Sequence, residues 1–263
     1  MPELPEVEYA AGIARRALVG RVITRVRVLH RSQRRGLTAS TIRRLTGDRV
    51  ERIERRGKYQ LLRLTSGRTL VVHFRMTGDW VVLLPDDAVP AAVRVVLTGD
   101  DGVRLALHDS RALSTVVLVE PDATLLTKLG PDATDPAFSA AWLRERLARR
   151  RGPIKVALLD QGVVAGVGNI YAAEALWYAR IDPRTPSSAL GPARLTRLVT
   201  GVRRALRKAL DDPLRYYGED GVSDAVRFNV YDREGVPCRR CRRPIKRIVQ
   251  GARSTYFCPF CQR

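Results

Sequence analysis

The chain has 263 residues, with 47 Lys and Arg against 27 Asp and Glu, so its formal net charge is +20. This excess indicates a polyanionic partner, because a neutral partner would leave the repulsion between like charges uncompensated. No apolar run approaches the roughly 20 residues of a membrane-spanning helix, and the acids and prolines of the N-terminus argue against a signal peptide. The composition therefore predicts an intracellular nucleic-acid-binding protein of one or two domains.

The chain begins Met-Pro-Glu-Leu-Pro-Glu-Val-Glu. Removal of Met1 would expose the secondary amine of Pro2, which can attack a carbon electrophile and form an iminium ion. An α-amino group has a pKa of about 7.7–8.0, so roughly a tenth of it is neutral near pH 7. Glu3 and Glu6 are close by in sequence, and Pro5 is expected at the first position of a helix. Taken alone, these residues favour an ordinary helix start with acids at its positive end.

Short apolar runs alternate with turns from residue 22 to residue 119. Ser66-Gly67 and Asp100-Asp101-Gly102 are typical of hairpin turns. Many short strands at this spacing predict an antiparallel sandwich or barrel. The expected strands are residues 22–29, 49–55, 58–64, 69–74, 80–84, 93–97, 103–107 and 113–119.

Residues 120–136 contain three prolines and are expected to link two domains. Beyond them the apolar residues recur at helical spacing, which predicts helices at 142–150, 154–159, 170–179 and 194–210. A glycine-rich connection, 162–168, joins two of these helices, an arrangement known from DNA-docking motifs. Asn169 begins the second helix, where its amide and the nearby backbone N–H groups could hold a phosphate or simply cap the helix.

Four cysteines lie in the last 26 residues, as two Cys-x2-Cys pairs separated by 16 residues. This spacing predicts one tetrahedral zinc site with four thiolate ligands, whereas two disulfides are disfavoured in a reducing compartment. Such a closed site is structural and holds together a hairpin, expected at residues 245–250 and 253–258, that is too small to fold alone. The ligands are Cys238, Cys241, Cys258 and Cys261.

Three segments together resemble the formamidopyrimidine-DNA glycosylase family and its endonuclease VIII-like relatives, which excise oxidised bases. They are the N-terminal Met-Pro-Glu-Leu-Pro-Glu, the Gly-Val-Gly-Asn-Ile-Tyr of residues 166–171, and the four-cysteine C-terminus. The resemblance spans nearly the whole chain. It implies an α+β fold: an N-terminal antiparallel β-sandwich domain, then a helical helix–two-turn–helix domain that ends in a zinc-finger hairpin.

The resemblance also implies catalytic residues. Pro2 would be the nucleophile, Glu3 would serve acid–base steps on the deoxyribose, and Lys58 would contact the phosphate of the damaged nucleotide. Glu6 and Glu174 would be supporting carboxylates, with Glu174 bracing the helix pair near the active site. Without the resemblance, Lys58 would be one basic residue on a solvated face.

Further residues are implied to contact DNA. Met76 would intercalate where the damaged nucleotide leaves the stack, Arg111 would read the orphaned base, and Leu113 would act as a wedge. Asn169 and Arg253 would hold backbone phosphates. Two departures from the family pattern put substrate preference in doubt: Leu113 replaces the usual phenylalanine, and residue 75 is arginine where glycine is common.

The predicted domains are residues 1–120 (catalytic β-sandwich with the N-terminal helix), 121–137 (linker), 138–229 (helix–two-turn–helix) and 230–263 (zinc finger). Residues 216–227 are expected to form a mobile loop over the extruded base. The expected protein is a monomeric, cytoplasmic, nucleoid-associated bacterial enzyme. It would bind damaged double-stranded DNA and one structural zinc ion, and would need neither a membrane nor a small-molecule cofactor.

The function implied is a bifunctional DNA glycosylase and AP lyase for oxidised purines, 8-oxoguanine and formamidopyrimidine. Two alternatives stay open. One is an endonuclease VIII-like enzyme for oxidised pyrimidines. The other is a protein that binds damaged or abasic DNA without chemistry, which would need the same charge, zinc hairpin and wedge but neither a free Pro2 amine nor Glu3.

Overall fold

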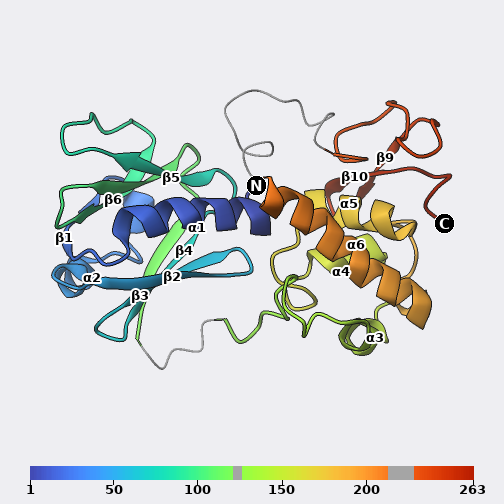
Figure 1. Cartoon of the computed structure of the whole chain (residues 1–263), viewed down its shortest axis with the longest axis horizontal. Helices are drawn as coiled ribbons and strands as arrows, with labels where there is room; N and C mark the ends of the chain where they lie inside the picture. Colours follow the sequence, from blue (N-terminus) through green and yellow to red (C-terminus); the bar gives the residue numbers. More distant parts are fainter. Residues whose placement is uncertain (121–125, 213–227) are drawn as a thin grey trace. The chain divides into compact units, whose positions relative to one another are not determined.

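The computed structural model describes residues 1–120, 126–212 and 228–263, and the chain divides into two compact units (Figure 1). Unit 1 comprises Met1–Pro2 and Glu6–Leu125, and unit 2 comprises Glu3–Pro5 and Leu126–Arg263. The expected loop at 216–227 lies outside the described residues, as do residues 121–125 of the expected linker.

Unit 1 is built from two four-stranded antiparallel sheets, one in the order β1-β6-β7-β5 and the other in the order β2-β3-β4-β8. The β3–β4 hairpin turns at Ser66-Gly67 as predicted, with Gly67 at a φ of 81°. The strands are β1 (Ile23–Val28), β2 (Val50–Arg56), β3 (Tyr59–Leu64), β4 (Thr69–His73), β5 (Gly78–Leu83), β6 (Val93–Gly99), β7 (Arg104–Asp109) and β8 (Thr115–Val119).

One buried cluster joins both sheets to helix α1 (Leu4–Leu18). It includes Leu62 and Val72 from one sheet, Leu97 and Leu107 from the other, and Ala14 from α1. The side chains that α1 adds are mostly alanine, so the helix backbone can lie close to its neighbours. This packing accounts for the apolar runs that mark the strands in the sequence.

One helix of unit 1 is not predicted by the sequence pattern. Helix α2 (Ala39–Leu45) has only seven residues, and Leu45 is its only fully buried side chain, so it has no helical periodicity to detect. Its start is instead defined by Thr38, whose hydroxyl accepts a hydrogen bond from the N–H of Thr41 at 3.2 Å. A single turn, η1 (Arg31–Gln33), precedes it.

The helices described after the linker lie between residues 140 and 211 of unit 2. Helix α5 is buried on nearly all sides and packs against the long helix α6, whose Gly201 lies so close to α5 that an added Cβ would be 2.5 Å from the carbonyl oxygen of Ala175. The elements are α3 (Ala140–Leu147), α4 (Ile154–Leu159), α5 (Asn169–Ala179), η2 (Ser187–Ala189) and α6 (Pro192–Asp211).

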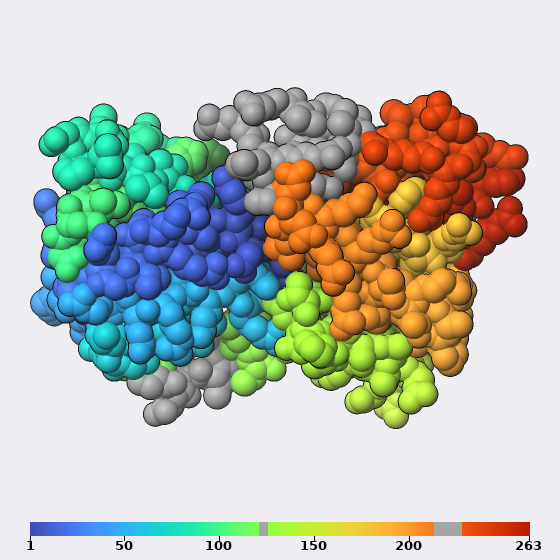
Figure 2. All heavy atoms as spheres, viewed as in Figure 1, coloured from blue at the N-terminus to red at the C-terminus, as the bar shows by residue number. Residues whose placement is uncertain are grey.

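The C-terminal hairpin of unit 2 consists of β9 (Lys246–Gln250) and β10 (Arg253–Phe257), joined by Gly251-Ala252. Both turn residues have positive φ angles, 54° and 57°, which suits a tight hairpin. The hairpin region packs on α5, because Cys238, Cys258 and Ile245 share a buried cluster with Ala173 and Trp177. Figure 2 shows this segment, in red, against the yellow of α5.

The predicted fold class, α+β with antiparallel sheets followed by helices and a four-cysteine hairpin, is confirmed. No helix within the described ranges is both long and apolar enough to cross a bilayer. The predicted domain boundaries stay a prediction.

Candidate functional site

The N-terminus of the chain is fastened to the start of α5. The Glu3 side chain is buried, with 1% of the residue exposed, and accepts hydrogen bonds from the backbone N–H groups of Gly168 (2.6 Å), Ile170 (2.8 Å) and Tyr171 (3.3 Å). The N–H of Leu4 adds a bond of 3.0 Å to the carbonyl oxygen of Gly166. The first N–H groups of a helix are otherwise unsatisfied and carry partial positive charge, so this arrangement suits an ionised carboxylate.

The glycines of the Gly166–Gly168 turn are required by this anchoring. A Cβ on Gly168 would lie 2.4 Å from the Glu3 carboxyl carbon, and one on Gly166 would lie 2.6 Å from Leu4. Gly166 also has a φ of 97°, which side chains other than glycine rarely adopt. Two motifs from distant parts of the sequence are therefore parts of one packed site.

This finding corrects two parts of the expectation for the start of α5: the role of its backbone N–H groups and the identity of its cap. The backbone N–H groups of Gly168, Ile170 and Tyr171 bind Glu3 rather than standing free for a phosphate. Asn169 does not cap the helix either; Gly168 holds the N-cap position, and the Asn169 side chain points to other partners.

Those partners are a buried lysine and the zinc hairpin. The Asn169 side-chain carbonyl accepts a hydrogen bond from Lys155 Nζ, and its NH2 donates to the carbonyl oxygen of Ser254 at 3.0 Å. Lys155 also donates to the Ser254 carbonyl oxygen at 3.3 Å. Burial lowers the pKa of Lys155 to about 8, and the Arg253 charge acts in the same direction while the Glu3 charge opposes it. Asn169 is thus joined to the first residues of β10 both directly and through Lys155.

Arg253, the other implied phosphate contact, is exposed at the first position of β10. Its register partner is Gln250 across the hairpin. Within the described residues, the Arg253 guanidinium has no hydrogen-bond partner.

Glu174 of α5 binds a segment that lies outside the helices. Its buried carboxylate accepts hydrogen bonds from the N–H groups of Asn229 (2.9 Å), Val230 (2.8 Å) and Tyr231 (3.1 Å), and from the Asn229 side chain (2.7 Å). It therefore fixes the segment before the zinc hairpin to α5, and its expected support of the helix pair near the active site stays a prediction. Tyr231 then packs edge-on against Tyr256 of β10 at 5.4 Å.

Lys58 in unit 1 lies in the two-residue turn between β2 and β3, one residue before the strand that it was expected to open. It is buried, and its positive charge contributes to the electrostatic environment of His73. Burial lowers the pKa of His73 to about 4, with Arg75 and Lys58 acting in the same direction, so the imidazole is neutral at pH 7. His73 Nδ1 can then accept the 3.0 Å hydrogen bond from the N–H of Arg75, and this bond shapes the start of the loop that carries Met76.

The loops that carry Met76 and Arg111 are joined by Asp109. Its buried carboxylate accepts hydrogen bonds from the Thr77 hydroxyl (2.5 Å) and from the N–H groups of Arg111 (3.2 Å) and Ser114 (2.7 Å). These donors hold the pKa of Asp109 below its ordinary value although burial acts to raise it. The structure thus brings two of the sequence-predicted DNA-contact loops together.

The side chains on these loops remain accessible. Met76 is 38% exposed and Leu113 is 44% exposed, both unusual for large apolar residues next to a core. Arg111 is exposed, and within the described residues its guanidinium has no hydrogen-bond partner. Such apolar tips beside a cation fit a surface that contacts bases rather than one that stabilises the sandwich.

The four cysteine sulfurs lie within 4.8 Å of one another, with Cys238 and Cys261 4.0 Å apart and Cys241 and Cys258 3.5 Å apart. Zinc–sulfur bonds of about 2.3 Å in a tetrahedron give sulfur separations in this range. Burial and the neighbouring sulfurs raise the pKa of Cys261 to about 12, so four thiolates need a cation to coexist. The donor set fits one structural zinc ion, as predicted.

The remaining predicted site residues lie at the start of the chain. Pro2 is half-buried beside the exposed Met1, and Glu6 lies in the first turn of α1, which begins at Leu4 rather than at Pro5 as expected. Pro2 is one peptide bond from the anchored Glu3.

Sequence reasoning missed two residues, Lys155 and Asp109. Lys155 is the only charged residue in the apolar helix α4, a signal that could have identified it as a buried functional or structural cation. Asp109 ends β7 next to Arg111, but nothing in the sequence indicates its bond to Thr77.

Comparison with known proteins agrees with this arrangement. Family models match the formamidopyrimidine-DNA glycosylase N-terminal domain over residues 1–116, its H2TH domain over 129–215, and a zinc finger found in FPG and IleRS over 235–263. The formamidopyrimidine-DNA glycosylase of Chloroflexus aurantiacus is 42% identical over 274 residues, which cover 100% of this chain and 98% of that protein.

Two solved structures are similar over essentially their whole length. The Lactococcus lactis FPG (MutM) in complex with DNA containing FAPY-dG is 30% identical, with a TM-score of 0.91 and coverage of 99% of this chain and 100% of that one. MutM in complex with DNA containing carbocyclic 8-oxo-G is 30% identical, with a TM-score of 0.92 and coverage of 100% of both chains. The chain therefore belongs to the formamidopyrimidine-DNA glycosylase family.

Proposed function

We propose that the protein is a bifunctional DNA glycosylase and AP lyase of base excision repair that removes 8-oxoguanine and formamidopyrimidine from double-stranded DNA. The observation that supports this most directly is the buried anchoring of Glu3 to Gly168, Ile170 and Tyr171. It holds the residue next to Pro2 in one place, which an ordinary solvent-exposed helix start does not need. Relatives solved with FAPY-dG and 8-oxo-G DNA support the substrate class. A cytoplasmic, chromosome-associated location follows from such a substrate.

The proposed reaction starts at Pro2 after removal of Met1. The neutral nitrogen attacks C1′ of an extruded nucleotide, the C1′–N bond to the base breaks, and the base leaves with the bonding electrons and takes up a proton. The deoxyribose C1′–O4′ bond opens with a proton delivered to O4′, a step in which Glu3 serves as the acid–base group. The nitrogen loses its proton, and a C1′=N iminium links protein to DNA.

The iminium makes the C2′ hydrogen acidic. Loss of that proton expels the phosphate from C3′, and loss of the C4′ proton in a second elimination expels the phosphate from C5′. Water then hydrolyses the iminium ion, which releases the sugar remnant as an unsaturated aldehyde together with a proton and returns the free Pro2 amine. The zinc ion has a structural role in this scheme, since it stabilises the hairpin that presents Arg253.

The remaining site residues have binding roles in this proposal. Lys58, Asn169 and Arg253 contact phosphates next to the damaged nucleotide. Met76 and Leu113 fill the space that the nucleotide leaves, and Arg111 contacts the base opposite it. The shared attachment of both wedge loops to Asp109 supports their acting together.

Borohydride reduction tests the chemistry, because it converts the iminium to a stable covalent bond. We expect trapping on 8-oxoguanine and on abasic duplex DNA, at Pro2 as located by mass spectrometry, and a sharp loss in the Pro2→Gly variant. A protein that binds these duplexes but traps on none of them would be a non-catalytic damage-binding protein.

The lesion itself is tested by an activity panel. We expect cleavage of 8-oxoguanine opposite cytosine and of formamidopyrimidine to be faster than cleavage of thymine glycol or dihydrouracil. The opposite order would assign the chain to the oxidised-pyrimidine specificity of the endonuclease VIII-like branch.

A further inference from the structure

The exposed side of α6 is strongly basic. The helix contains six Arg and Lys residues but one acid, Asp211. Its apolar side chains, such as Leu198, Val202 and Leu206, are buried in the core of unit 2. Figure 2 shows α6 as an orange ridge on the surface. Because the apolar side is already covered, this helix cannot insert into a lipid surface as a free amphipathic helix would.

Two aromatic residues at the end of α5 lie between the basic side of α6 and the first cysteine pair of the zinc region. Arg204 and Lys208 of α6 lie over the ring of Tyr178, at 4.9 and 5.8 Å from its centroid. The adjacent Trp177 ring carries Arg240 of the zinc region at 3.6 Å. Cations from α6 and from the zinc region therefore lie around the C-terminal end of α5.

Two cavities lie along this surface. One of about 720 Å³ is lined by Arg180, Arg197, Arg240 and Arg263, together with Phe260 and two of the zinc-ligand cysteines, Cys241 and Cys261. The other, of about 520 Å³, is lined by further side chains of α6, including Thr200, Arg204, Arg207 and Lys208.

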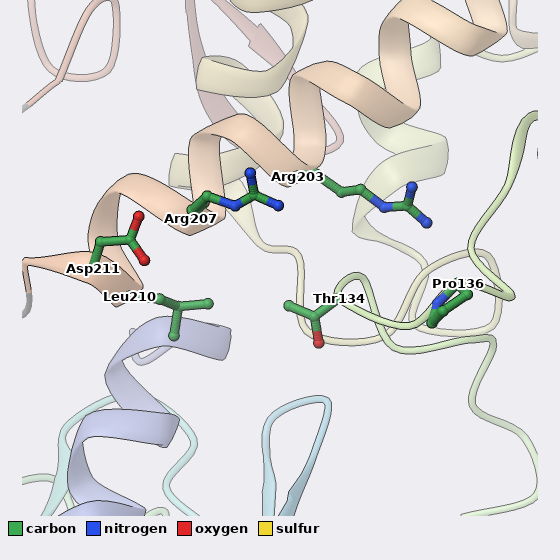
Figure 3. A pocket seen from close by; sticks show the side chains of 6 residues that line it. All are labelled: Thr134, Pro136, Arg203, Arg207, Leu210 and Asp211. Atoms are coloured by element: carbon green, nitrogen blue, oxygen red, sulfur yellow. The ribbon is translucent and has the colours of Figure 1, made fainter.

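A third cavity, also of about 520 Å³, adjoins the same helix. Figure 3 shows Arg203 and Arg207 projecting into it from successive turns of α6, with Thr134 and Pro136 on the opposite side.

Structural roles account for only part of this charge. Arg197 donates to the carbonyl oxygen of Ala179 and Arg240 to that of Trp177, so these two arginines satisfy the last carbonyls of α5. Among the described residues, however, Arg180, Arg204, Arg207 and Lys208 form no ion pair with a carboxylate. A zinc ion with four thiolates would carry two negative charges, which is fewer than the cations gathered here.

We propose that Arg180, Arg204, Arg207 and Lys208, the α6 basic face, bind the phosphate backbone of a second, undamaged DNA segment while the site at Glu3 holds the first. Guanidinium groups match phosphate oxygens in paired hydrogen bonds. From Arg197 to Lys208 the helix rises about 16 Å, a length over which duplex DNA presents roughly ten phosphate charges. A protein with two such faces passes directly from one DNA segment to another.

Dissociation kinetics test this inference, which rests on the proposed function only for the first DNA segment. A fluorescent undamaged duplex is bound to the full-length protein and displaced with increasing concentrations of unlabelled duplex. We expect the wild-type dissociation rate to rise with competitor concentration, and Arg204→Gln/Arg207→Gln/Lys208→Gln to abolish that rise. For binding of the second duplex, the slope of log K against log salt should fall by about 3, close to 0.9 per lost phosphate contact.

A matched control removes three exposed arginines of the same unit, as Arg144→Gln/Arg149→Gln/Arg151→Gln. It should keep the competitor dependence. Loss of the dependence in both variants, or its persistence in the α6 variant, would overturn the inference. So would competition by polyglutamate peptide at lower charge concentration than duplex DNA, which would identify an acidic protein partner. Borohydride trapping, measured on the same samples, reports on the proposed chemistry separately from the transfer rates.

Discussion

The exposed loop residues of unit 1 and the buried anchoring residues of unit 2 lie in opposite surroundings. In unit 1, Met76, Arg111 and Leu113 are exposed on turns at the ends of strands, above a continuous apolar core. In unit 2, Glu3 and Lys155 are buried and bonded to groups far away in sequence. The exposed contact residues of unit 1 are separate from its apolar core. The buried residues of the site in unit 2, by contrast, are themselves part of the packed interior.

This difference has a physical consequence. A residue at a turn tip can be changed with little effect on stability, because few of its atoms are packed. A buried polar group that loses its partner incurs the full cost of desolvation. We therefore expect substitutions of the buried, bonded residues of unit 2 to affect structure and activity together, and substitutions of the exposed loop residues of unit 1 to affect DNA binding alone.

The largest effect is expected from loss of the metal ligands. Cys258→Ser should release the zinc ion, unfold the hairpin that carries Arg253, and weaken DNA binding, because structural zinc sites supply the folding free energy of small hairpins. Zinc content and calorimetry measure the outcome. Unit 1 should keep its own unfolding transition. A variant with unchanged zinc content would contradict the four-cysteine site.

Gly168→Ala should be next in effect. The added methyl group would overlap the Glu3 carboxyl carbon, at 2.4 Å, and displace the residue beside Pro2. A shift of about 1 Å in a reacting group can cost roughly a hundredfold in rate, so single-turnover trapping should slow by that order. Gly152→Ala is the control, since among the described residues nothing beyond its chain neighbours lies within 4 Å of an added Cβ. Equal rates in the two variants would show that the anchoring does not position the amine.

Met76→Ala tests the exposed loops of unit 1. Binding to lesion-containing duplex should weaken roughly tenfold, about 1.4 kcal/mol, because the side chain no longer fills the gap in the stack. The unfolding midpoint should stay unchanged. Leu84→Ala, which truncates another exposed apolar side chain of unit 1, should alter neither quantity. A large drop in the midpoint for Met76→Ala would mean that this residue belongs to the core.

Lys155→Met tests the buried cation of unit 2 through pH. The folded protein holds the pKa of Lys155 at about 8 against an ordinary 10.5, so folding disfavours its charged form at neutral pH. As pH rises from about 8 to 10.5, the unfolded chain binds more protons than the folded one, and the wild type should gain stability. The gain relative to Lys155→Met should be of order 1–3 kcal/mol. Parallel stability curves for the two proteins would contradict a lowered pKa.

The smallest effect is expected at Arg75, whose φ of 60° is left-handed. Arg75→Gly removes about 1–2 kcal/mol of backbone strain, but the added freedom of the unfolded chain offsets part of it. The unfolding midpoint of unit 1 should therefore rise slightly. Arg16→Gly in helix α1 should instead cost about 1 kcal/mol. A decrease at Arg75 as large as that at Arg16 would mean that the arginine side chain stabilises the loop.

Much of the architecture could be predicted from the sequence. All eight expected strands of unit 1 are present, with ends shifted by about two residues at most, because each strand is an apolar run bounded by turn residues. The zinc ligands could be predicted because two Cys-x2-Cys pairs at this spacing are typical of a four-thiolate zinc site. Helix α2 could not, since its seven residues bury a single leucine.

The site could be predicted only in part, and the family resemblance supplied most of its residue roles. The Pro2-Glu3 start and the Gly166–Gly168 turn are visible as two separate motifs, but each by itself is equally typical of an ordinary helix start or an ordinary turn. The two motifs form one site only because Glu3 accepts hydrogen bonds from N–H groups 165 to 168 residues away. No local propensity encodes a bond of that kind.

The sequence by itself therefore determined the periodic elements, the metal ligands and the charge that selects a polyanion, since each depends on residue type and short spacing. Only the tertiary structure decided which backbone donors hold Glu3, that Glu174 fastens the Asn229–Tyr231 segment, and that Lys155 is buried beside Asn169. Those outcomes depend on which polar groups meet inside a packed interior. There, each buried donor or acceptor must find its partner wherever the fold supplies one.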